Sequence, residues 1–138
     1  MRVAVLFFGG ARRDKTAEVA RGLAGGIEKA GHQVDVIDGD RDVNSKLTVY
    51  EYIAVGTSAV SMFSGKIDPK IPEFLGRAGM VTGKKCSAFV LTSHFGSQKA
   101  LRRLMAALEH EGMFIRYSDI LRSREEAEVL AGRLKLQH

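Results

Sequence analysis

Short apolar stretches alternate with amphipathic stretches along the whole chain. The first, Val3 to Phe8, is a continuous apolar run without two-residue periodicity, which is typical of a strand that is covered on both faces. Similar strand-like stretches follow at intervals. The predicted strands are residues 3–8, 33–37, 52–56, 85–91 and 113–117.

Between the strands, apolar residues recur at three- and four-residue spacing, which indicates helices that bury one face. Ser97 is a candidate N-cap of the third helix, and Ser123 with Glu126 forms a capping box at the start of the last one. The segment 38–46 is polar and predicts no helix. The predicted helices lie at about 15–30, 67–75, 97–108 and 123–134.

Five strands that alternate with helices predict a parallel α/β sheet with helices on both faces, because right-handed crossovers return the chain to the same edge. With 138 residues, the chain fits a single domain spanning 1–138. Such sheets bind ligands outside the carboxyl ends of their strands. We therefore expect the loops 9–15, 57–66 and 92–97 to meet there.

Composition narrows the class of protein. Apolar residues make up 45% and charged residues 27%, which argues against disorder and against a membrane protein. The run from Val3 to Phe8 is too short to span a bilayer and precedes no signal-peptide cleavage site, so a cytoplasmic location is expected. The net charge of +5 is compatible with an anionic ligand, whereas the scattered arginines make nucleic acid an unlikely partner.

Metal chemistry is not expected. Cys86 is the only cysteine and lies within a predicted strand, where it is interpreted as a small core thiol. The four histidines lack the spacing of a zinc site.

The loop after the first strand has the features of an anion cradle. Gly9 and Gly10 allow close backbone approach, and the following helix start offers free amides and the positive end of a dipole. Arg12, Arg13 and Thr16 are candidate donors to the anion, unless the arginines are only solvated. Asp14, in the same loop, either caps the helix or repels a phosphate.

The same loop is one substitution short of a Walker A motif. Gly9 is followed, after four residues, by Asp14-Lys15-Thr16 in place of Gly-Lys-Thr. The missing glycine removes the close backbone approach that the motif needs, and only Asp38 could serve as a second-motif aspartate. Nucleotide hydrolysis is therefore not favoured.

The second and third loops combine hydroxyls with apolar groups that suit a planar ligand. His94 is in addition a candidate acid or hydrogen-bond donor. We find no nucleophile–base pair and no acid–base carboxylate pair at this edge, so no catalytic residue is assigned and a cofactor-carrying module is favoured over a hydrolase. The candidate residues are Thr57, Ser58, Met62, Phe63, Thr92, Ser93, His94, Phe95 and Gly96.

Nearly the whole chain resembles the flavodoxin family. The segments that carry the resemblance are 16–20, 50–57, 67–75, 83–85 and 93–112. The resemblance implies a three-layer α/β/α sandwich with a five-stranded parallel sheet in the order 2-1-3-4-5. It also implies flavin mononucleotide (FMN) as the cofactor, and electron transfer or flavin-dependent reduction, an oxidoreductase activity, as the function.

Carried over to this chain, the resemblance implies two groups of cofactor-binding residues. The phosphate would be held by the first loop, and the ring would lie between the second and third loops, where a carbonyl near Gly65 could accept a hydrogen bond from reduced flavin. Those for the phosphate are Gly9, Gly10, Arg12, Arg13, Lys15 and Thr16. Those for the ring are Thr57, Ser58, Met62 and Phe63 on one side and Thr92, Ser93, His94, Phe95 and Gly96 on the other.

Two hypotheses remain open. In the first, the protein is an FMN-binding redox protein, and its basic charge predicts an acidic redox partner. In the second, Asp14 and the shortage of hydroxyls in the first loop leave a flavin-free module that binds an anion or another protein. The fold alone does not decide between them.

Overall fold

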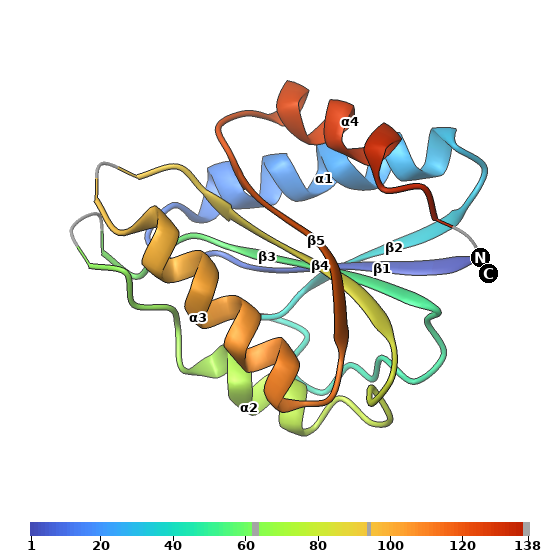
Figure 1. The fold of residues 1–138 in the computed structure, drawn as a ribbon, viewed down its shortest axis with the longest axis horizontal. Helices are drawn as coiled ribbons and strands as arrows, with labels where there is room; N and C mark the ends of the chain where they lie inside the picture. Colours follow the sequence, from blue (N-terminus) through green and yellow to red (C-terminus); the bar gives the residue numbers. More distant parts are fainter. Residues whose placement is uncertain (62–63, 94, 137–138) are drawn as a thin grey trace.

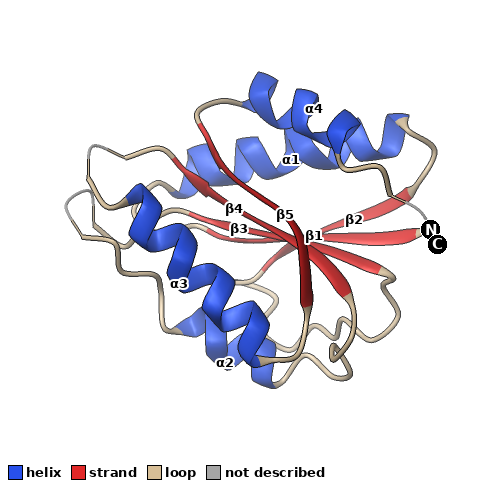
Figure 2. Ribbon diagram, viewed as in Figure 1, coloured by secondary structure: helices blue, strands red, loops and turns tan. Residues whose placement is uncertain are grey.

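The computed structural model describes residues 1–61, 64–93 and 95–136 and contains five parallel strands in one sheet, in the order β2-β1-β3-β4-β5 (Figures 1 and 2). The strands are β1 (Arg2–Phe8), β2 (Gln33–Asp38), β3 (Tyr52–Thr57), β4 (Lys85–Leu91) and β5 (Phe114–Leu121). The helices are α1 (Arg13–Lys29), α2 (Lys70–Gly76), α3 (Ser97–His110) and α4 (Arg124–Arg133). The predicted α/β sandwich and its strand order are confirmed.

The helices form two layers, one on each face of the sheet. In Figure 1, α1 and α4 lie above the strands, and α2 and α3 lie below them. Each layer closes a separate hydrophobic core, as expected when both faces of a parallel sheet are covered. Phe8 of β1 belongs to the lower core, where its ring contacts that of Phe74 edge to face at a centroid distance of 5.5 Å. No helix in the described part of the chain is both long and apolar enough to cross a membrane.

The register of the strands aligns their carboxyl ends. β1 pairs with both β2 and β3, which places Phe7 opposite Asp38 and Phe8 opposite Thr57. Thr57 lies in turn opposite Val90 of β4. The loops that follow β1, β3 and β4 therefore leave the sheet side by side, as predicted for the ligand-binding edge.

Two helix starts differ from the sequence expectation. The N-cap of α1 is Arg12, without a side-chain hydrogen bond, so Asp14 is not the cap. The N-cap of α3 is Gly96, at φ 82°, because the Ser97 hydroxyl instead accepts a hydrogen bond from the Ser93 amide at 2.9 Å. At α4 the expectation is confirmed, since the Ser123 hydroxyl accepts a hydrogen bond from the Glu126 amide at 3.2 Å.

The last strand is longer than predicted. β5 continues to Leu121, although Ser118 and Asp119 interrupt its apolar pattern, because an edge strand tolerates polar positions on its open side. The pairing of β4 with β5 shifts register between Cys86 and Ser87, where β5 accommodates an extra residue. Cys86 is fully buried, and burial raises the pKa of its thiol to about 12, as expected of a core thiol.

Candidate functional site

The first and second loops are joined through their backbones. The Ala11 amide donates to the Ala59 carbonyl at 3.1 Å, and the Arg12 amide donates to the Ser58 hydroxyl at 3.2 Å. That hydroxyl donates to the Gly9 carbonyl at 2.6 Å. These contacts fix the path of the first loop without any ligand, so Ser58 has a positioning role in the protein as it stands.

Two further hydroxyls of the predicted site also support the backbone. Thr16 is fully buried, and its hydroxyl lies 2.8 Å from the Arg12 carbonyl and 3.1 Å from the Gly9 carbonyl. Thr57, which is also fully buried, donates to the Phe8 carbonyl at 2.8 Å. Both hydroxyls shape the loops and point their protons at protein carbonyls.

The start of α1, in contrast, presents unpaired donors. The amides of Arg13, Asp14 and Lys15 make no hydrogen bond with any residue that the structure describes. No side chain caps this end of the helix. Unpaired amides at a helix start, together with the helix dipole, are the groups that helix starts use when they bind an anion.

Arg13 is held by two carboxylates that the sequence analysis did not place in the site. Its guanidinium bonds to Asp38 and, at 2.9 Å, to Asp40. The Asp40 carboxylate also accepts a hydrogen bond from the Gly9 amide at 2.8 Å. Asp40 is therefore an internal anion that takes up two donors of the first loop. The expected strand order could have identified these two aspartates, because it places the end of β2 beside the loop after β1.

Arg12 connects the first loop to the third. Its guanidinium donates to the Thr92 carbonyl at 3.0 Å, across the carboxyl end of β3, which lies between β1 and β4 in the sheet. Both Arg12 and Arg13 are exposed, and Lys15 is half-buried beside them. The structure thus brings the predicted basic residues of the first loop to one edge, where Arg12 and Arg13 have different partners.

The second and third loops pack directly against each other. A Cβ atom on Gly96 would lie 2.8 Å from the Gly65 nitrogen, so these loops meet at two glycines. Phe95 is 62% exposed and Val60 is 42% exposed, which leaves apolar groups at the outer end of both loops. Of the other candidates, Ser93 donates to the Phe95 carbonyl at 2.7 Å. Met62, Phe63 and His94 lie outside the described residues.

Ser64 is a residue of this site that the sequence analysis did not single out. Its hydroxyl oxygen is buried, next to the contact between Gly65 and Gly96, and has no hydrogen-bond partner in the described ranges 1–61, 64–93 and 95–136. A buried hydroxyl without a partner destabilises a fold unless a ligand or water pairs with it. No signal in the sequence distinguishes Ser64 from the other serines of the loop.

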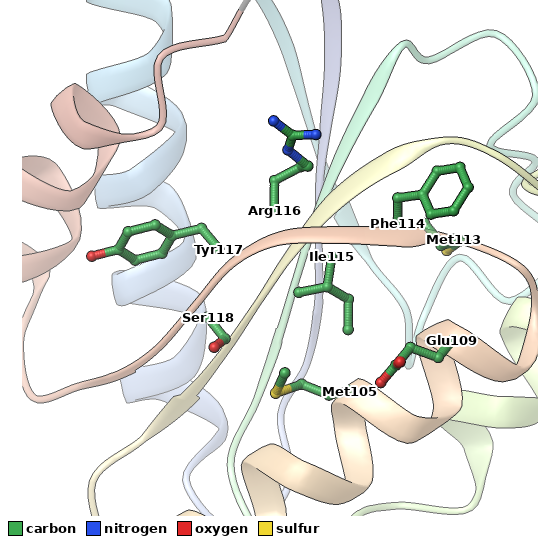
Figure 3. Close-up of a pocket in the computed structure, with 8 residues that line it drawn as sticks. All are labelled: Met105, Glu109, Met113, Phe114, Ile115, Arg116, Tyr117 and Ser118. Atoms are coloured by element: carbon green, nitrogen blue, oxygen red, sulfur yellow. The ribbon is translucent and has the colours of Figure 1, made fainter.

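A concave surface adjoins the first loop. It is open to solvent, has a volume of about 550 Å³, and is lined by Gly9, Gly10, Arg13 and Asp40 among others. A second concavity, of about 710 Å³, lies along the outer side of β5 next to α3 (Figure 3). The second is lined by residues of α3, β5 and the turn between them and not by the three loops, so of these two concavities the first belongs to this site.

The Asp38–Arg13 pair predicts a pH dependence of stability. Burial by itself would raise the pKa of Asp38, but hydrogen bonds from Arg13 and the Asp40 amide outweigh it and hold that pKa below its ordinary value. The folded state therefore binds fewer protons than the unfolded state near pH 4, and the stabilisation is present above that pH and lost as the pH falls through the lowered pKa.

We expect Asp38→Asn to reduce the free energy of unfolding at pH 7, and the difference from the unmodified protein to shrink below about pH 4, where the unfolded-state carboxyl is protonated. Urea denaturation at pH 7 and pH 3 measures this. The exposed Asp14→Asn is the control, with little effect at either pH. A difference for Asp38→Asn that is the same at both pH values would contradict the ion-pair account.

Comparison with solved structures identifies the fold of the chain. No protein-family model matches the chain, and no curated protein matches it significantly. Among solved structures, flavodoxin 1 from Bacillus cereus superposes with a TM-score of 0.78 at 20% identity, covering 99% of this chain and 100% of that one. A flavodoxin from the domain Archaea gives 0.73 at 19% identity, with the same coverage. The chain has the flavodoxin fold.

The flavodoxin fold also occurs within a larger protein among these matches. Rubredoxin oxygen:oxidoreductase from Desulfovibrio gigas matches with a TM-score of 0.72 at 15% identity, over 96% of this chain and 35% of that one. The flavodoxin fold is therefore shown for this chain over nearly its whole length.

We tested whether the site fits the FMN implied by the sequence resemblance. A phosphate needs anion donors, which the start of α1 supplies through its three unpaired amides. The polar edge of a flavin ring needs hydrogen-bond partners, and Ser64 offers an unpaired hydroxyl at the contact of the second and third loops. The described residues thus fit both the phosphate and the ring of FMN, although Asp40 takes up two donors of the first loop.

Proposed function

We propose that this protein binds FMN and acts as a redox protein, either as an electron carrier or as a small flavin-dependent reductase. The observation that carries the proposal is the uncapped start of α1, with its unpaired amides, at the edge where the three loops meet. The flavodoxin fold over nearly the whole chain supports it.

In this proposal the amides of residues 13–15 hold the phosphate, with Arg12 and Lys15 beside them. The ring lies against the second and third loops, where the Ser64 hydroxyl pairs with a polar ring atom and Phe95 covers apolar surface. Bound FMN would supply the one- or two-electron chemistry. The chain itself would bind and orient the flavin, and would limit the access of water to it.

The positive and negative charges around the first loop balance one another. Arg12, Arg13 and Lys15 are balanced by Asp14 and by the two carboxylates that pair with Arg13, Asp38 and Asp40. Phosphate binding therefore depends on the helix amides more than on net charge. The excess positive charge elsewhere on the chain favours an acidic redox partner, whose rate of reduction should fall as ionic strength rises.

The test is a visible absorption spectrum of the freshly purified protein, followed by titration with FMN. We expect flavin absorbance in the purified protein, or a spectral shift that saturates at one equivalent with a dissociation constant in the micromolar range or lower. Arg12→Ala should weaken FMN binding about tenfold, because it removes one charge-assisted contact. Arg21→Ala, which removes an exposed arginine from the middle of α1, is the matched control.

A second candidate function is favoured by one observation, the pairing of Arg13 with Asp38 and Asp40. Because this pairing occupies the Arg13 guanidinium without a ligand, a flavin-free module that binds another anion or a protein would keep the same fold. A colourless protein that gives no spectral change with added FMN would overturn the flavin proposal in favour of this one.

A further inference from the structure

A basic concavity lies at the other end of the sheet from the three loops. It has a volume of about 240 Å³ and lies between the carboxyl end of α4 and the first halves of β3, β4 and β5. Four basic residues and two tyrosines line it: Lys85, Arg116, Arg133, Lys135, Tyr52 and Tyr117. No part of the proposed flavin site belongs to this concavity.

The four basic residues carry charges that no carboxylate of the described residues pairs with. None of them forms an ion pair with a described carboxylate, and all four are exposed. Gathering like charges opposes folding, and the partial negative charge at the carboxyl end of α4 offsets only part of this repulsion. An anion that binds among them would remove the repulsion.

Tyr52 provides an independent indication of a ligand. It is only 4% exposed and lines the concavity, and its hydroxyl oxygen is buried with no hydrogen-bond partner among the residues that the structure describes. Burial raises the pKa of this hydroxyl, against smaller opposing effects of the Ser87 hydroxyl, which lies nearby but outside hydrogen-bond geometry, and of Arg116, so Tyr52 stays protonated at neutral pH. A protonated hydroxyl without a partner is a donor that an anion can use.

The basic concavity and the concavity beside α3 share Arg116 and Tyr117 of β5 in their linings. Figure 3 shows Ile115 pointing toward Met105 of α3, whereas Tyr117 points to the side of α1 and α4 and Arg116 points away from α3. The register shift between β4 and β5 lies at this position, opposite Cys86 and Ser87. The irregularity of the strand is therefore what places Arg116 at the basic concavity.

We propose that the basic concavity binds a small, multiply charged phosphate compound, of the size and charge of inorganic pyrophosphate. Several cations around one concavity match several negative charges on one ligand, and phosphate oxygens accept from guanidinium, ammonium and hydroxyl groups alike. The volume is below that of most drug-sized sites, which favours a compact anion.

The proposal is tested by isothermal titration calorimetry of the full chain with inorganic pyrophosphate at low ionic strength. We expect saturable binding at one equivalent. The double variant Arg116→Ala/Arg133→Ala should weaken it at least thirtyfold, because each lost charge-assisted contact corresponds to roughly tenfold. The matched control, Arg102→Ala/Arg103→Ala, removes two exposed arginines from α3 and should change the affinity less than twofold.

Tyr52→Phe keeps the ring and removes the hydroxyl, so it separates binding from folding. It should weaken pyrophosphate binding about tenfold while leaving the melting temperature of the ligand-free protein unchanged or higher. The proposal is overturned if no saturable binding occurs, if both double variants weaken it equally, or if FMN displaces pyrophosphate stoichiometrically. Binding to vesicles of anionic phospholipid without binding of free pyrophosphate would overturn it as well.

Discussion

Replacing Asp40 by asparagine is expected to tighten FMN binding about tenfold and to leave riboflavin binding unchanged. Asp40 places a carboxylate against the Gly9 amide at 2.8 Å and against Arg13 at 2.9 Å, next to the proposed phosphate position. The Asp40 carboxylate repels the phosphate of FMN, and riboflavin has no phosphate. Removing this partly screened repulsion should lower the free energy of FMN binding by about 1.4 kcal/mol, which corresponds to tenfold in affinity. Fluorescence titration with each flavin measures the two affinities.

Asp42→Asn is the matched control for this prediction. Asp42 lies in the same turn, and its side chain is 40% exposed, compared with 21% for Asp40, but it pairs with Arg41 and not with the first loop. It should change neither affinity by more than twofold. An Asp40→Asn variant that tightens FMN and riboflavin binding equally would contradict the electrostatic argument, while absence of any flavin binding would contradict the proposed function itself.

Gly10→Ala is expected to destabilise the protein by about 3 kcal/mol and to disrupt the first loop. Gly10 has a φ of +60°, and a Cβ atom there would lie 2.1 Å from the Ser58 carbonyl oxygen, which is backbone and cannot move aside easily. The left-handed conformation costs about 1–2 kcal/mol for an alanine, and the steric overlap adds a cost of roughly 1–3 kcal/mol. Chemical denaturation measures the loss.

Gly25→Ala is the control, because it makes the same chemical change without the strain. Gly25 lies within α1, and a Cβ atom there would meet nothing within 4 Å. We expect this variant to gain about 0.5–1 kcal/mol, since alanine loses less conformational entropy than glycine in a helix. Equal effects of the two substitutions would show that the contact between Gly10 and Ser58 does not hold the first loop in place.

Helices and strands could be predicted where a pattern among residues close in sequence determines them. The apolar run of β1 and the capping box at Ser123 depend on residues close in sequence, so their periodicity and spacing are visible without a structure. The length of β5 could not be predicted, because its polar residues are tolerated by its position at the edge of the sheet. The start of α3 was misplaced since Ser97 bonds to Ser93 and not to its own helix.

For the candidate site, the location could be predicted from the sequence but the side-chain contacts could not. The sequence indicated that the loops after β1, β3 and β4 would meet, because alternation of strands and helices implies a parallel sheet whose carboxyl ends share an edge. The partners of each side chain could not be deduced. That Ser58 supports the Gly9 carbonyl, and that Asp40 takes up donors of the first loop, depends on distances between segments far apart in the chain.

The sequence by itself thus determined the fold class, the single sheet and the edge where a ligand is expected, since these follow from local periodicity and from the connections between elements. Only the tertiary structure decided which donors are left unpaired, at the start of α1, at Ser64 and at Tyr52. The physical reason is that a hydrogen bond or an ion pair forms within about 3 Å, and the sequence does not state which distant residues come that close.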